Sequence, residues 1–329
     1  MKTAIEVLDA FENIRRAQRA GVYAPHKPLL ILLALARVQR GEPRMVEFTA
    51  IDSPLTQLLA EFGPSSAAKS RHYPFWHLAT DGHGALWDLS GPRDVLKRPA
   101  GATPSLGELR EHHIKGGFPA DIDDSLRHVP GLLQAVAARV LDTYFPETLH
   151  ADIVSTLGLD LDGASALRDG APAPADYTAA ERRRRDPSFR ERVLRAYEYR
   201  CCVCGFDLRV GHIPAGLEAA HIQWHHVGGP DIEPNGLSLC ALHHKLFDLG
   251  VFTVDSAEHR IVFSQHAISG GRGMDGELRF HGRAIHAPQN SDLLPAPEFL
   301  AWNSKNVFKK PGRQVAPVGD TPLSSSRTS

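Results

Sequence analysis

The 329-residue chain lacks the features that would place it at once among nucleic-acid-binding, secreted or membrane proteins. Its formal net charge is -1, so no overall positive field attracts nucleic acid, and any basic surface for DNA must be local. The first residues, MKTAIEVLDAFENIRR, carry acids early and contain no apolar core of the secretory type. The most apolar run, Lys27 to Val38, is too short to cross a bilayer and predicts a buried helix. We therefore expect a cytoplasmic protein with no membrane partner.

Cysteine is scarce and confined to one segment. All four cysteines lie between Cys201 and Cys240, whereas disulfide frameworks spread their cysteines along the chain. Cys201 and Cys204 form a C-x-x-C pair, and Cys240 and His243 repeat the spacing as C-x-x-H. Four such ligands in two pairs suit a closed tetrahedral Zn²⁺ site, which would help a small β-rich segment to fold.

Two alternatives to this zinc set stay open. The cysteines could simply be buried small residues. Cys202, which sits between the first pair, is expected to be a packed free thiol, but Cys202 and Cys204 also form a chelating C-V-C pair.

The pattern along the chain predicts two domains and a linker, in agreement with about 150 residues per domain. Apolar residues at helical spacing predict helices within 1–20 and 129–145. HYPFWHL and GALWDL, on either side of the turn Asp81-Gly82, predict short strands. Residues 155–180 are rich in Ala, Gly, Asp and Pro and predict the linker. The expected divisions are 1–150 for the first domain, 151–185 for the linker, 186–286 for the second domain and 287–329 for a partly flexible extension.

The second domain is expected to open with a helix and a local positive charge. Asp186 is a candidate N-cap with Pro187 in the first helical position, and Phe189, Val193 and Tyr197 form the apolar stripe. The preceding run 182–185 is RRRR, which predicts either contact with backbone phosphates or a solvated linker.

A His…Asn…His series is interleaved with the zinc ligands. His221 lies in the predicted strand LEAAHIQW, Asn235 lies in EPNGLSLC just before a second strand, and His244 opens the predicted helix HKLFDLG. This order of strand, loop, strand and helix resembles the HNH, or ββα-metal, nucleases. The resemblance covers roughly residues 190–255, and the zinc pairs flank the series in the register of the zinc-stabilised members.

The resemblance implies hydrolysis of a phosphodiester with one divalent ion, Mg²⁺ or Mn²⁺. His221 would take the proton from the attacking water, His244 would bind the ion, and Asn235 would hold the loop and orient the general base. Many HNH nucleases have an Asp directly before the general-base His, where this chain has Ala220. Glu218 shares the strand face of Ala220 and is the candidate second ligand, with a surface carboxylate as the competing interpretation.

Three neighbours of the series have open roles. His225 and His226 could contact phosphate, or they could be exposed loop residues. Asp248 lies one helical turn after His244 and could orient it, or simply pack at the end of the helix.

The first domain carries a second, less specific resemblance. RHYPFWHL at 71–78, DGHGALWDL and GGFPADI resemble the sulfur-binding domain of bacterial restriction endonucleases that recognise phosphorothioate-modified DNA. In that family a mostly helical domain precedes an HNH nuclease. The resemblance implies a shallow apolar sulfur pocket, in which Arg71 holds the charge beside the pair Phe118-Pro119. Tyr is the common aromatic in that pair, so Phe118 would lose a hydroxyl contact. Further candidate contacts are His72, Tyr73, His26, Lys27 and Lys115, whereas Phe75 and Trp76 are expected in the core.

Together the two resemblances imply an α+β, type IV, modification-dependent DNA endonuclease. A mostly helical DNA-reading domain would be joined by a linker to a ββα-metal HNH domain. Its partner would be double-stranded DNA carrying phosphorothioate, its metals would be structural Zn²⁺ and catalytic Mg²⁺ or Mn²⁺, and a homodimer would allow both strands to be cut. The alternatives are an HNH endonuclease triggered by methylcytosine or by a fixed sequence, and a non-cleaving, zinc-stabilised DNA-binding protein.

Overall fold

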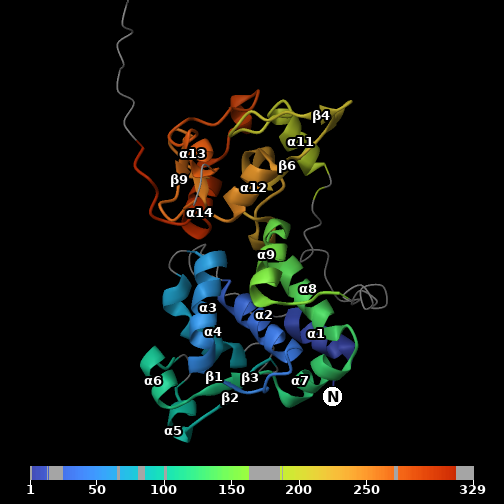
Figure 1. Ribbon diagram of the computed structural model, residues 1–329, viewed down its shortest axis with the longest axis vertical. Helices are drawn as coiled ribbons and strands as arrows, with labels where there is room; N and C mark the ends of the chain where they lie inside the picture. Colours follow the sequence, from blue (N-terminus) through green and yellow to red (C-terminus); the bar gives the residue numbers. More distant parts are fainter. Residues whose placement is uncertain are drawn as a thin grey trace, which may run out of the picture.

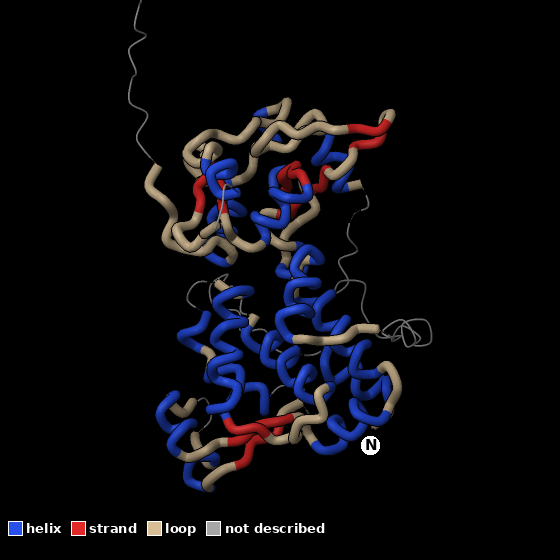
Figure 2. The backbone as a smooth tube through the Cα atoms, in the orientation of Figure 1, coloured by secondary structure: helices blue, strands red, loops and turns tan. Residues whose placement is uncertain are grey.

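The computed structural model describes residues 2–12, 14, 25–64, 67–80, 86–99, 102–162, 186, 188–269 and 273–315. Its elements form two groups along the chain, each around its own apolar core (Figures 1 and 2). Helices and small sheets together confirm the predicted α+β class. No described helix combines the length and the apolar character that a membrane crossing requires.

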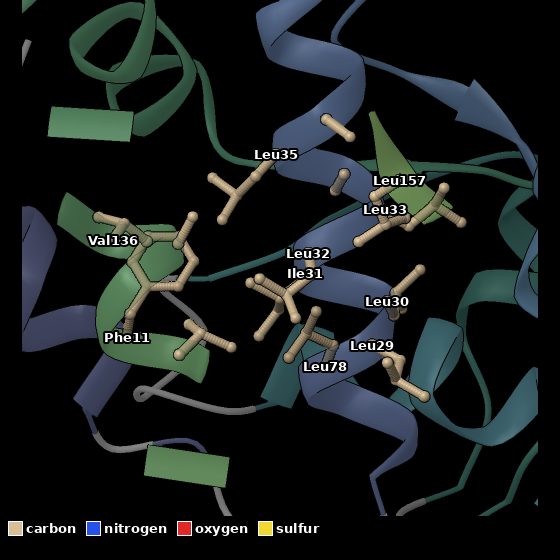
Figure 3. Packing of buried hydrophobic residues seen from close by; sticks show 14 of the residues in the cluster. Phe11, Leu29, Leu30, Ile31, Leu32, Leu33, Leu35, Leu78, Val136 and Leu157 are labelled. Atoms are coloured by element: carbon tan, nitrogen blue, oxygen red, sulfur yellow. The ribbon is translucent and has the colours of Figure 1, made fainter. Parts of the chain in front are cut away.

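The first domain is built around one central helix. Helix α2 (His26–Gln39) begins after Pro25, and its residues from Pro28 to Ala36 are buried. A helix that is apolar on all sides must be covered on all sides, and Figure 3 shows its leucines among residues of other elements. The surrounding helices are α1 (Ala4–Glu12), α3 (Phe48–Phe62), α4 (His72–His77), α5 (Arg93–Leu96), α6 (Leu106–Glu111), α7 (Ala120–His128), α8 (Leu132–Tyr144) and α9 (Glu147–Leu157), with the 3-10 helix η1 (Ala67–Ser70).

A small antiparallel sheet closes one end of this domain. Its strands are β1 (Val46–Glu47), β3 (Lys115–Gly117) and β2 (Asp88–Ser90), in that spatial order. Gly116 lets the aromatic core approach the middle strand, because a Cβ there would lie 2.5 Å from Nε1 of Trp87 and 2.8 Å from the ring of Phe75.

The expectation of two strands around Asp81-Gly82 is half wrong. HYPFWH forms helix α4, whereas the last two residues of GALWDL, Asp88 and Leu89, belong to strand β2. A short apolar run fits a helix turn as well as a strand, and Pro74 lies in the first turn, where its missing N–H costs no bond. Helix α4 buries Phe75 against Phe48, with ring centroids 5.2 Å apart. The turn at 81–82 lies outside the described residues.

The predicted domain boundary at residue 150 falls inside α9. The apolar face of this helix, Leu149, Ile153 and Leu157, is buried in the first core, which also includes Leu159. The predicted helix within 129–145 is confirmed as α8, and Pro146 separates it from α9. The linker residues 163–185, with the run 182–185, lie outside the described residues.

The second domain places a β-hairpin between two helices. Helix α11 (Phe189–Ala196) begins after Ser188, two residues later than predicted, and Asp186 accepts a hydrogen bond from the Ser188 N–H at 2.8 Å. The hairpin is β6 (Leu217–His221) with β7 (Gly236–Cys240), followed by α12 (Ala241–Asp248). The other elements are β4 (Arg209–Val210), β5 (Ile213–Pro214), η3 (His225–Val227), η4 (Glu233–Asn235), β8 (Phe252–Val254), β9 (Ile261–Phe263), α13 (Gly273–Leu278), η5 (Ser291–Leu293) and α14 (Pro297–Asn306).

Much of the expected C-terminal extension is folded. Helix α14 packs on β8 and buries Leu300, Asn303 and Asn306. The segment 316–329, which includes PVGDTPLSSSRTS, lies outside the described residues.

The two domains are packed together along α9 and α12 (Figure 1). Trp224 and Val307 of the second domain belong to the apolar core of the first. Lys309 also crosses the boundary, where its Nζ donates to the carbonyl groups of Ala60 and Gly63 near the end of α3.

Candidate functional site

Four ligand atoms converge beside the β6–β7 hairpin. The sulfur atoms of Cys201, Cys204 and Cys240 and a ring nitrogen of His243 lie within 4.8 Å of one another. Nδ1 of His243 is 3.1 Å from Sγ of Cys240 and 3.6 Å from Sγ of Cys201. A tetrahedral Zn²⁺ with bonds of about 2.0–2.3 Å spaces its ligand atoms by about 3.5–3.8 Å. The group therefore fits a structural zinc ion.

The local sequence explains why these residues meet. Gly205 has φ +75°, and its N–H donates to the carbonyl of Cys201 at 2.9 Å, which forms the knuckle after the first pair. Cys240 ends β7 and caps α12, so His243 lies in the first turn of that helix. Nε2 of His243 is 2.9 Å from a carboxylate oxygen of Glu277, a partner of the kind that orients metal-binding imidazoles.

The cysteines differ in their proton affinity. Hydrogen bonds from Cys204 and Cys240 lower the pKa of Cys201 to about 3, which favours the thiolate that a metal requires. Burial raises the pKa of Cys202 well above its usual value, and this residue packs in the second core as a free thiol.

His221 is the last residue of β6 and is held by a carboxylate. Its Nε2 is 2.7 Å from Oδ1 of Asp231, and its ring stacks on Phe189 with centroids 4.1 Å apart. Burial of Asp231 opposes ionisation, but hydrogen bonds from the Asp186 N–H and from His221 outweigh it and lower its pKa. An ionised carboxylate only accepts hydrogen bonds, so Nε2 donates to Asp231, and in the neutral form of the ring the lone pair is on Nδ1.

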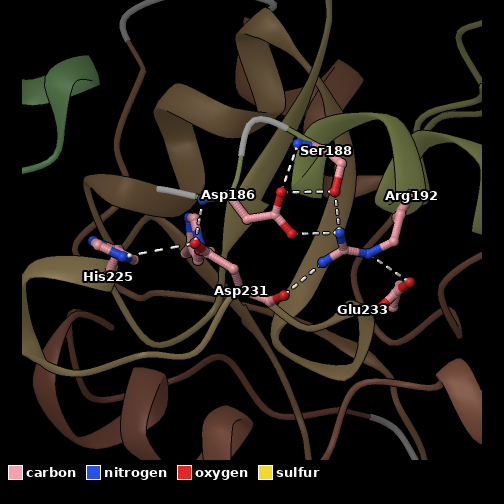
Figure 4. Close-up of polar contacts among 7 residues, drawn as sticks. Asp186, Ser188, Arg192, His225, Asp231 and Glu233 are labelled. Atoms are coloured by element: carbon pink, nitrogen blue, oxygen red, sulfur yellow. Dashed lines mark hydrogen bonds and ion pairs between the residues drawn. The ribbon is translucent and has the colours of Figure 1, made fainter. Parts of the chain in front are cut away.

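The loop that carries Asp231 is itself fixed by Arg192 (Figure 4). The guanidinium donates to the carbonyl of Asp231 at 2.7 Å and pairs with Glu233 at 2.9 Å and with Asp186 at 2.6 Å. His225 faces the other oxygen of Asp231 at 3.7 Å. His225 is therefore part of the site rather than an exposed loop residue.

Asn235 ties the same loop to the hairpin. Its fully buried side chain accepts from the N–H of Gln223 at 2.8 Å and donates to the carbonyls of Gln223 and Pro230 at 3.0 and 2.9 Å. The next residue, Gly236, faces α11 so closely that a Cβ would lie 2.4 Å from Val193.

His244 lies between two carboxylates. Nδ1 is 2.6 Å from Oε2 of Glu218, and Nε2 is 3.2 Å from Oδ2 of Asp248. Burial opposes protonation of His244, but the hydrogen bonds to Asp248 and Glu218 outweigh it and raise its pKa to about 9. Ala220, where many HNH nucleases have Asp, is fully buried in the core and offers no ligand atom.

Both imidazoles line a single cavity of about 540 Å³. The second domain contributes its carboxylates and histidines, and the first domain contributes Pro146, Glu147 and Thr148. His226 also lines the cavity, and its ring lies against Trp224 with centroids 5.4 Å apart. The cavity can therefore hold a ligand that contacts both His221 and His244.

The residues expected to read DNA lie elsewhere, in the first domain. Arg71 precedes α4, where its Nε binds Asp52 and its Nη1 donates to the carbonyl of Ala68 at 3.0 Å. Tyr73 is 48% exposed, and its ring lies against those of His72 and His77. Arg71 is thus held rigidly beside an exposed aromatic side chain.

Phe118 is placed differently from the expectation. Only 2% exposed, it packs in the core with its ring 5.5 Å from that of Phe11 and 5.6 Å from that of Trp87. Without a hydroxyl group, this ring can be buried at no polar cost. Its neighbour Pro119 is partly exposed at the start of α7.

The lysines and the other aromatic candidates divide between surface and interior. Lys115 is exposed on β3 with its Nζ 3.7 Å from Glu47, and Lys27 is partly buried in α2. His26 is turned inward, with Nε2 2.9 Å from the carbonyl of Ala67. Phe75 is in the core as expected, and Trp76 packs against it from a partly buried position.

A β-hairpin followed by a helix, each with a carboxylate-paired histidine that lines one cavity, is the arrangement of the ββα-metal class of nucleases. Residues 201–255 match the family described as HNH endonuclease, and residues 4–162 match the family described as ScoMcrA-like, DNA sulfur-binding domain. The chain therefore joins a DNA sulfur-binding domain to an HNH endonuclease domain, and it is an enzyme of the HNH endonuclease type.

Several solved structures are similar to this chain. "Sulfur binding domain of ScoMcrA complexed with phosphorothioated DNA" is 24% identical over 48% of this chain and 97% of that chain, with a TM-score of 0.41. The corresponding complex of SprMcrA is 23% identical over 49% and 97%, with a TM-score of 0.39. "Structure of the Type IV phosphorothioation-dependent restriction endonuclease ScoMcrA" is 22% identical over 49% of this chain and 29% of that chain, with a TM-score of 0.37. No curated protein sequence matches the chain.

Sequence reasoning missed Asp231, Glu277 and Thr148. Asp231 lies in the loop segment GGPDIEP. The sequence shows that this loop carries an acidic residue, but it does not show that the residue contacts His221. Glu277 and Thr148 are 34 residues after His243 and 100 residues before Asp248, so only the folded chain brings these pairs together.

Proposed function

We propose that this protein is a modification-dependent DNA endonuclease, which binds phosphorothioate-bearing double-stranded DNA through its first domain and hydrolyses a nearby phosphodiester in its second. The observation that carries the proposal is the single cavity lined by His221 and His244, each hydrogen-bonded to a carboxylate. A base and a metal ligand on one cavity are what phosphodiester hydrolysis requires.

His221 is the general base in this proposal. Asp231 fixes the proton on Nε2, and the stack on Phe189 fixes the plane of the ring. Nδ1 can then accept the proton of a water molecule that attacks the phosphorus atom. Asn235 keeps the loop between the two strands in place through its three hydrogen bonds.

His244 and Glu218 are the proposed ligands of the catalytic ion. Nδ1 of His244 and the facing oxygen of Glu218 are adjacent, and Nε2 faces Asp248, the arrangement common for metal-binding histidines. The carboxylate oxygen suits Mg²⁺ or Mn²⁺, and the imidazole nitrogen favours the softer Mn²⁺ over Mg²⁺. When bound, such an ion polarises the scissile phosphate and stabilises the leaving oxygen. Glu218 thus takes the place of the Asp that is absent at Ala220.

The first domain is proposed to select the modified DNA. Sulfur is larger and less strongly hydrated than oxygen, so apolar contact favours it, while a guanidinium holds the remaining charge. Arg71 and the neighbouring Tyr73 and His72 are proposed contacts, and Pro119, Lys27 and Lys115 are proposed as further contacts. The burial of Phe118 supports a role in core packing rather than in direct contact with DNA.

The proposal is tested by cleavage of matched duplexes with and without one phosphorothioate, in Mg²⁺ or Mn²⁺. We expect cleavage of the modified duplex only, and loss of cleavage in His221→Ala. His212→Ala is the matched control, because His212 is exposed in the turn between β4 and β5. Equal cleavage of a methylcytosine duplex or of a plain duplex would replace the proposed trigger, and no cleavage of any duplex would contradict the proposed activity.

Glu218→Gln tests the proposed ligand separately. The amide keeps the shape but is a weaker ligand for a hard cation, so we expect a higher Mn²⁺ requirement for cleavage with unchanged binding of modified DNA. An unchanged Mn²⁺ requirement would remove Glu218 from the metal site.

Light scattering on the cognate duplex tests the proposed homodimer. A monomer bound to a duplex that is cut in both strands would contradict it.

A further inference from the structure

Asp248 lies where the two domains meet and faces three hydrogen-bonding side chains. It accepts from the hydroxyl group of Thr148 and, at 3.0 Å, from Nε1 of Trp224, while Nε2 of His244 lies 3.2 Å away. Asp248 is only 3% exposed, so these groups rather than water satisfy its carboxylate. Its orientation therefore depends on all three.

Two of these three partners connect Asp248 to the first domain. Thr148 is the second residue of α9, and the side chain of Trp224 belongs to the first core. His244 is the third partner and the proposed metal ligand. A single buried carboxylate thus joins the DNA-reading domain to the nuclease centre.

The position of Thr148 is fixed by its backbone as well. Lys245, the residue after His244, donates from Nζ to the carbonyl of Thr148 and forms an ion pair with Asp152 one turn further along α9. The start of α9 therefore cannot shift without disturbing α12.

The start of α9 also forms part of the wall of the nuclease cavity. Pro146, Glu147 and Thr148 line it together with Glu218 and His244. The second domain alone would leave this side of the cavity open and remove one donor from Asp248.

We propose that Thr148, a residue of the DNA sulfur-binding domain, is a positioning residue of the nuclease centre. Its hydroxyl group holds Asp248, and Asp248 holds His244 so that Nδ1 faces Glu218. This inference rests on the proposed role of His244 as a metal ligand. It makes the geometry of the nuclease centre depend on the docking of α9 against α12, and so couples the DNA-reading domain to cleavage.

The test measures Mn²⁺ binding directly, by electron paramagnetic resonance of free Mn²⁺ with the zinc-loaded full chain and without DNA. Thr148→Val keeps the volume of the side chain and removes the hydroxyl group, and we expect about tenfold weaker Mn²⁺ binding. Thr148→Ser restores the hydroxyl group and should restore the affinity. Thr156→Val is the matched control, since Thr156 is exposed on the same helix.

A double-mutant cycle shows whether Thr148 acts through Asp248. If it does, Thr148→Val should add little to the effect of Asp248→Asn. Zinc content and thermal unfolding establish that each variant is folded, and His244→Ala establishes that the measured ion binds at this centre.

The inference is overturned if Thr148→Val binds Mn²⁺ as tightly as the wild type, or if Thr148→Ser is as weak as Thr148→Val. If the Thr148 variants bind Mn²⁺ as expected but the wild-type protein cuts no duplex, the proposed function is contradicted and the positioning role is still supported. The two failures are therefore distinguishable.

Discussion

The carboxylate of Asp231 lies 2.7 Å from Nε2 of His221 and fixes which ring nitrogen carries the proton. Asp231 is held in turn by the N–H of Asp186, at 2.7 Å, and through its own carbonyl by Arg192. The segment before α11 and the loop before β7 thus converge on the proposed general base.

Replacing Asp231 with Asn should slow cleavage strongly without preventing DNA binding. The amide can donate to Nε2, which would move the ring proton to Nδ1 and remove the lone pair from the atom proposed to accept a proton. We expect a fall of about 100-fold in the single-turnover rate. Asp207→Asn, an exposed carboxylate in the same domain, is the control. A wild-type rate in Asp231→Asn would rule out this role.

Removal of zinc should unfold the second domain selectively. The four candidate zinc ligands connect the segment after α11 to the hairpin and to α12. Binding of structural zinc contributes about 10–16 kcal/mol in small domains. Cys204→Ser is expected to lose zinc and cleavage. The first core includes Trp224 and Val307 of the second domain, but its other buried residues lie between Val7 and Leu159. The first domain should therefore keep most of its helical circular dichroism and its affinity for modified DNA.

Cys202→Ala separates metal binding from packing. Cys202 is fully buried and lies between two ligands, but its sulfur is not in the ligand group. We expect one zinc ion per chain in this variant by elemental analysis, with a modest loss of stability. Loss of zinc in Cys202→Ala would favour the alternative C-V-C pairing.

Local spacing predicted the zinc ligands, and the resemblance to HNH nucleases implied the His221, Asn235 and His244 series. A C-x-x-C knuckle and a strand-loop-strand-helix order are short-range patterns, so residues close in sequence already fix most of the geometry. Asp231 and Thr148 reach their partners only through hairpin pairing and domain docking. No periodicity in the sequence encodes either contact.

The errors have equally local causes. HYPFWH is short enough to satisfy strand and helix patterns alike, and the burial of Phe75 decided for the helix. The composition becomes typical of a linker soon after residue 150, but the apolar spacing of Leu149, Ile153 and Leu157 continues past it and forms α9. The resemblance alone places Phe118 at a surface, whereas in the fold its ring fills the core beside Phe11 and Trp87.

The placement of Phe118 predicts a loss of stability rather than a simple loss of binding. Phe118→Ala would leave a cavity beside Trp87 and Phe11, at a cost of about 3–5 kcal/mol in unfolding free energy. Tyr73→Ala, at an exposed position, should cost less than about 1 kcal/mol. Urea unfolding of the two variants checks the contrast, and equal losses would contradict the assigned burial.

Arg71→Ala should weaken binding of phosphorothioate duplex by about 10- to 100-fold, the usual effect of losing a charge-assisted hydrogen bond. Its guanidinium is held by Asp52 and by the carbonyl of Ala68, so little conformational entropy opposes its contact with DNA. Arg93→Ala removes an exposed charge from the same domain and is the control in gel-shift titrations. Equal effects of the two substitutions would reduce Arg71 to a general electrostatic role.

Lys309 predicts a pH-dependent change in stability at the domain boundary. Burial lowers the pKa of its ammonium group from 10.5 to about 8. The unfolded chain then holds this proton more tightly than the folded one, so the unfolding free energy should rise as the pH increases from about 8 to about 10.5. Below about pH 8 the group is charged in both states and its burial is unfavourable. Urea unfolding of wild type and Lys309→Met across this range should show the rise in the wild type only, with exposed Lys97→Met as the control. Parallel curves for wild type and Lys309→Met would mean that the carbonyl groups of Ala60 and Gly63 fully offset the cost of burying the charge.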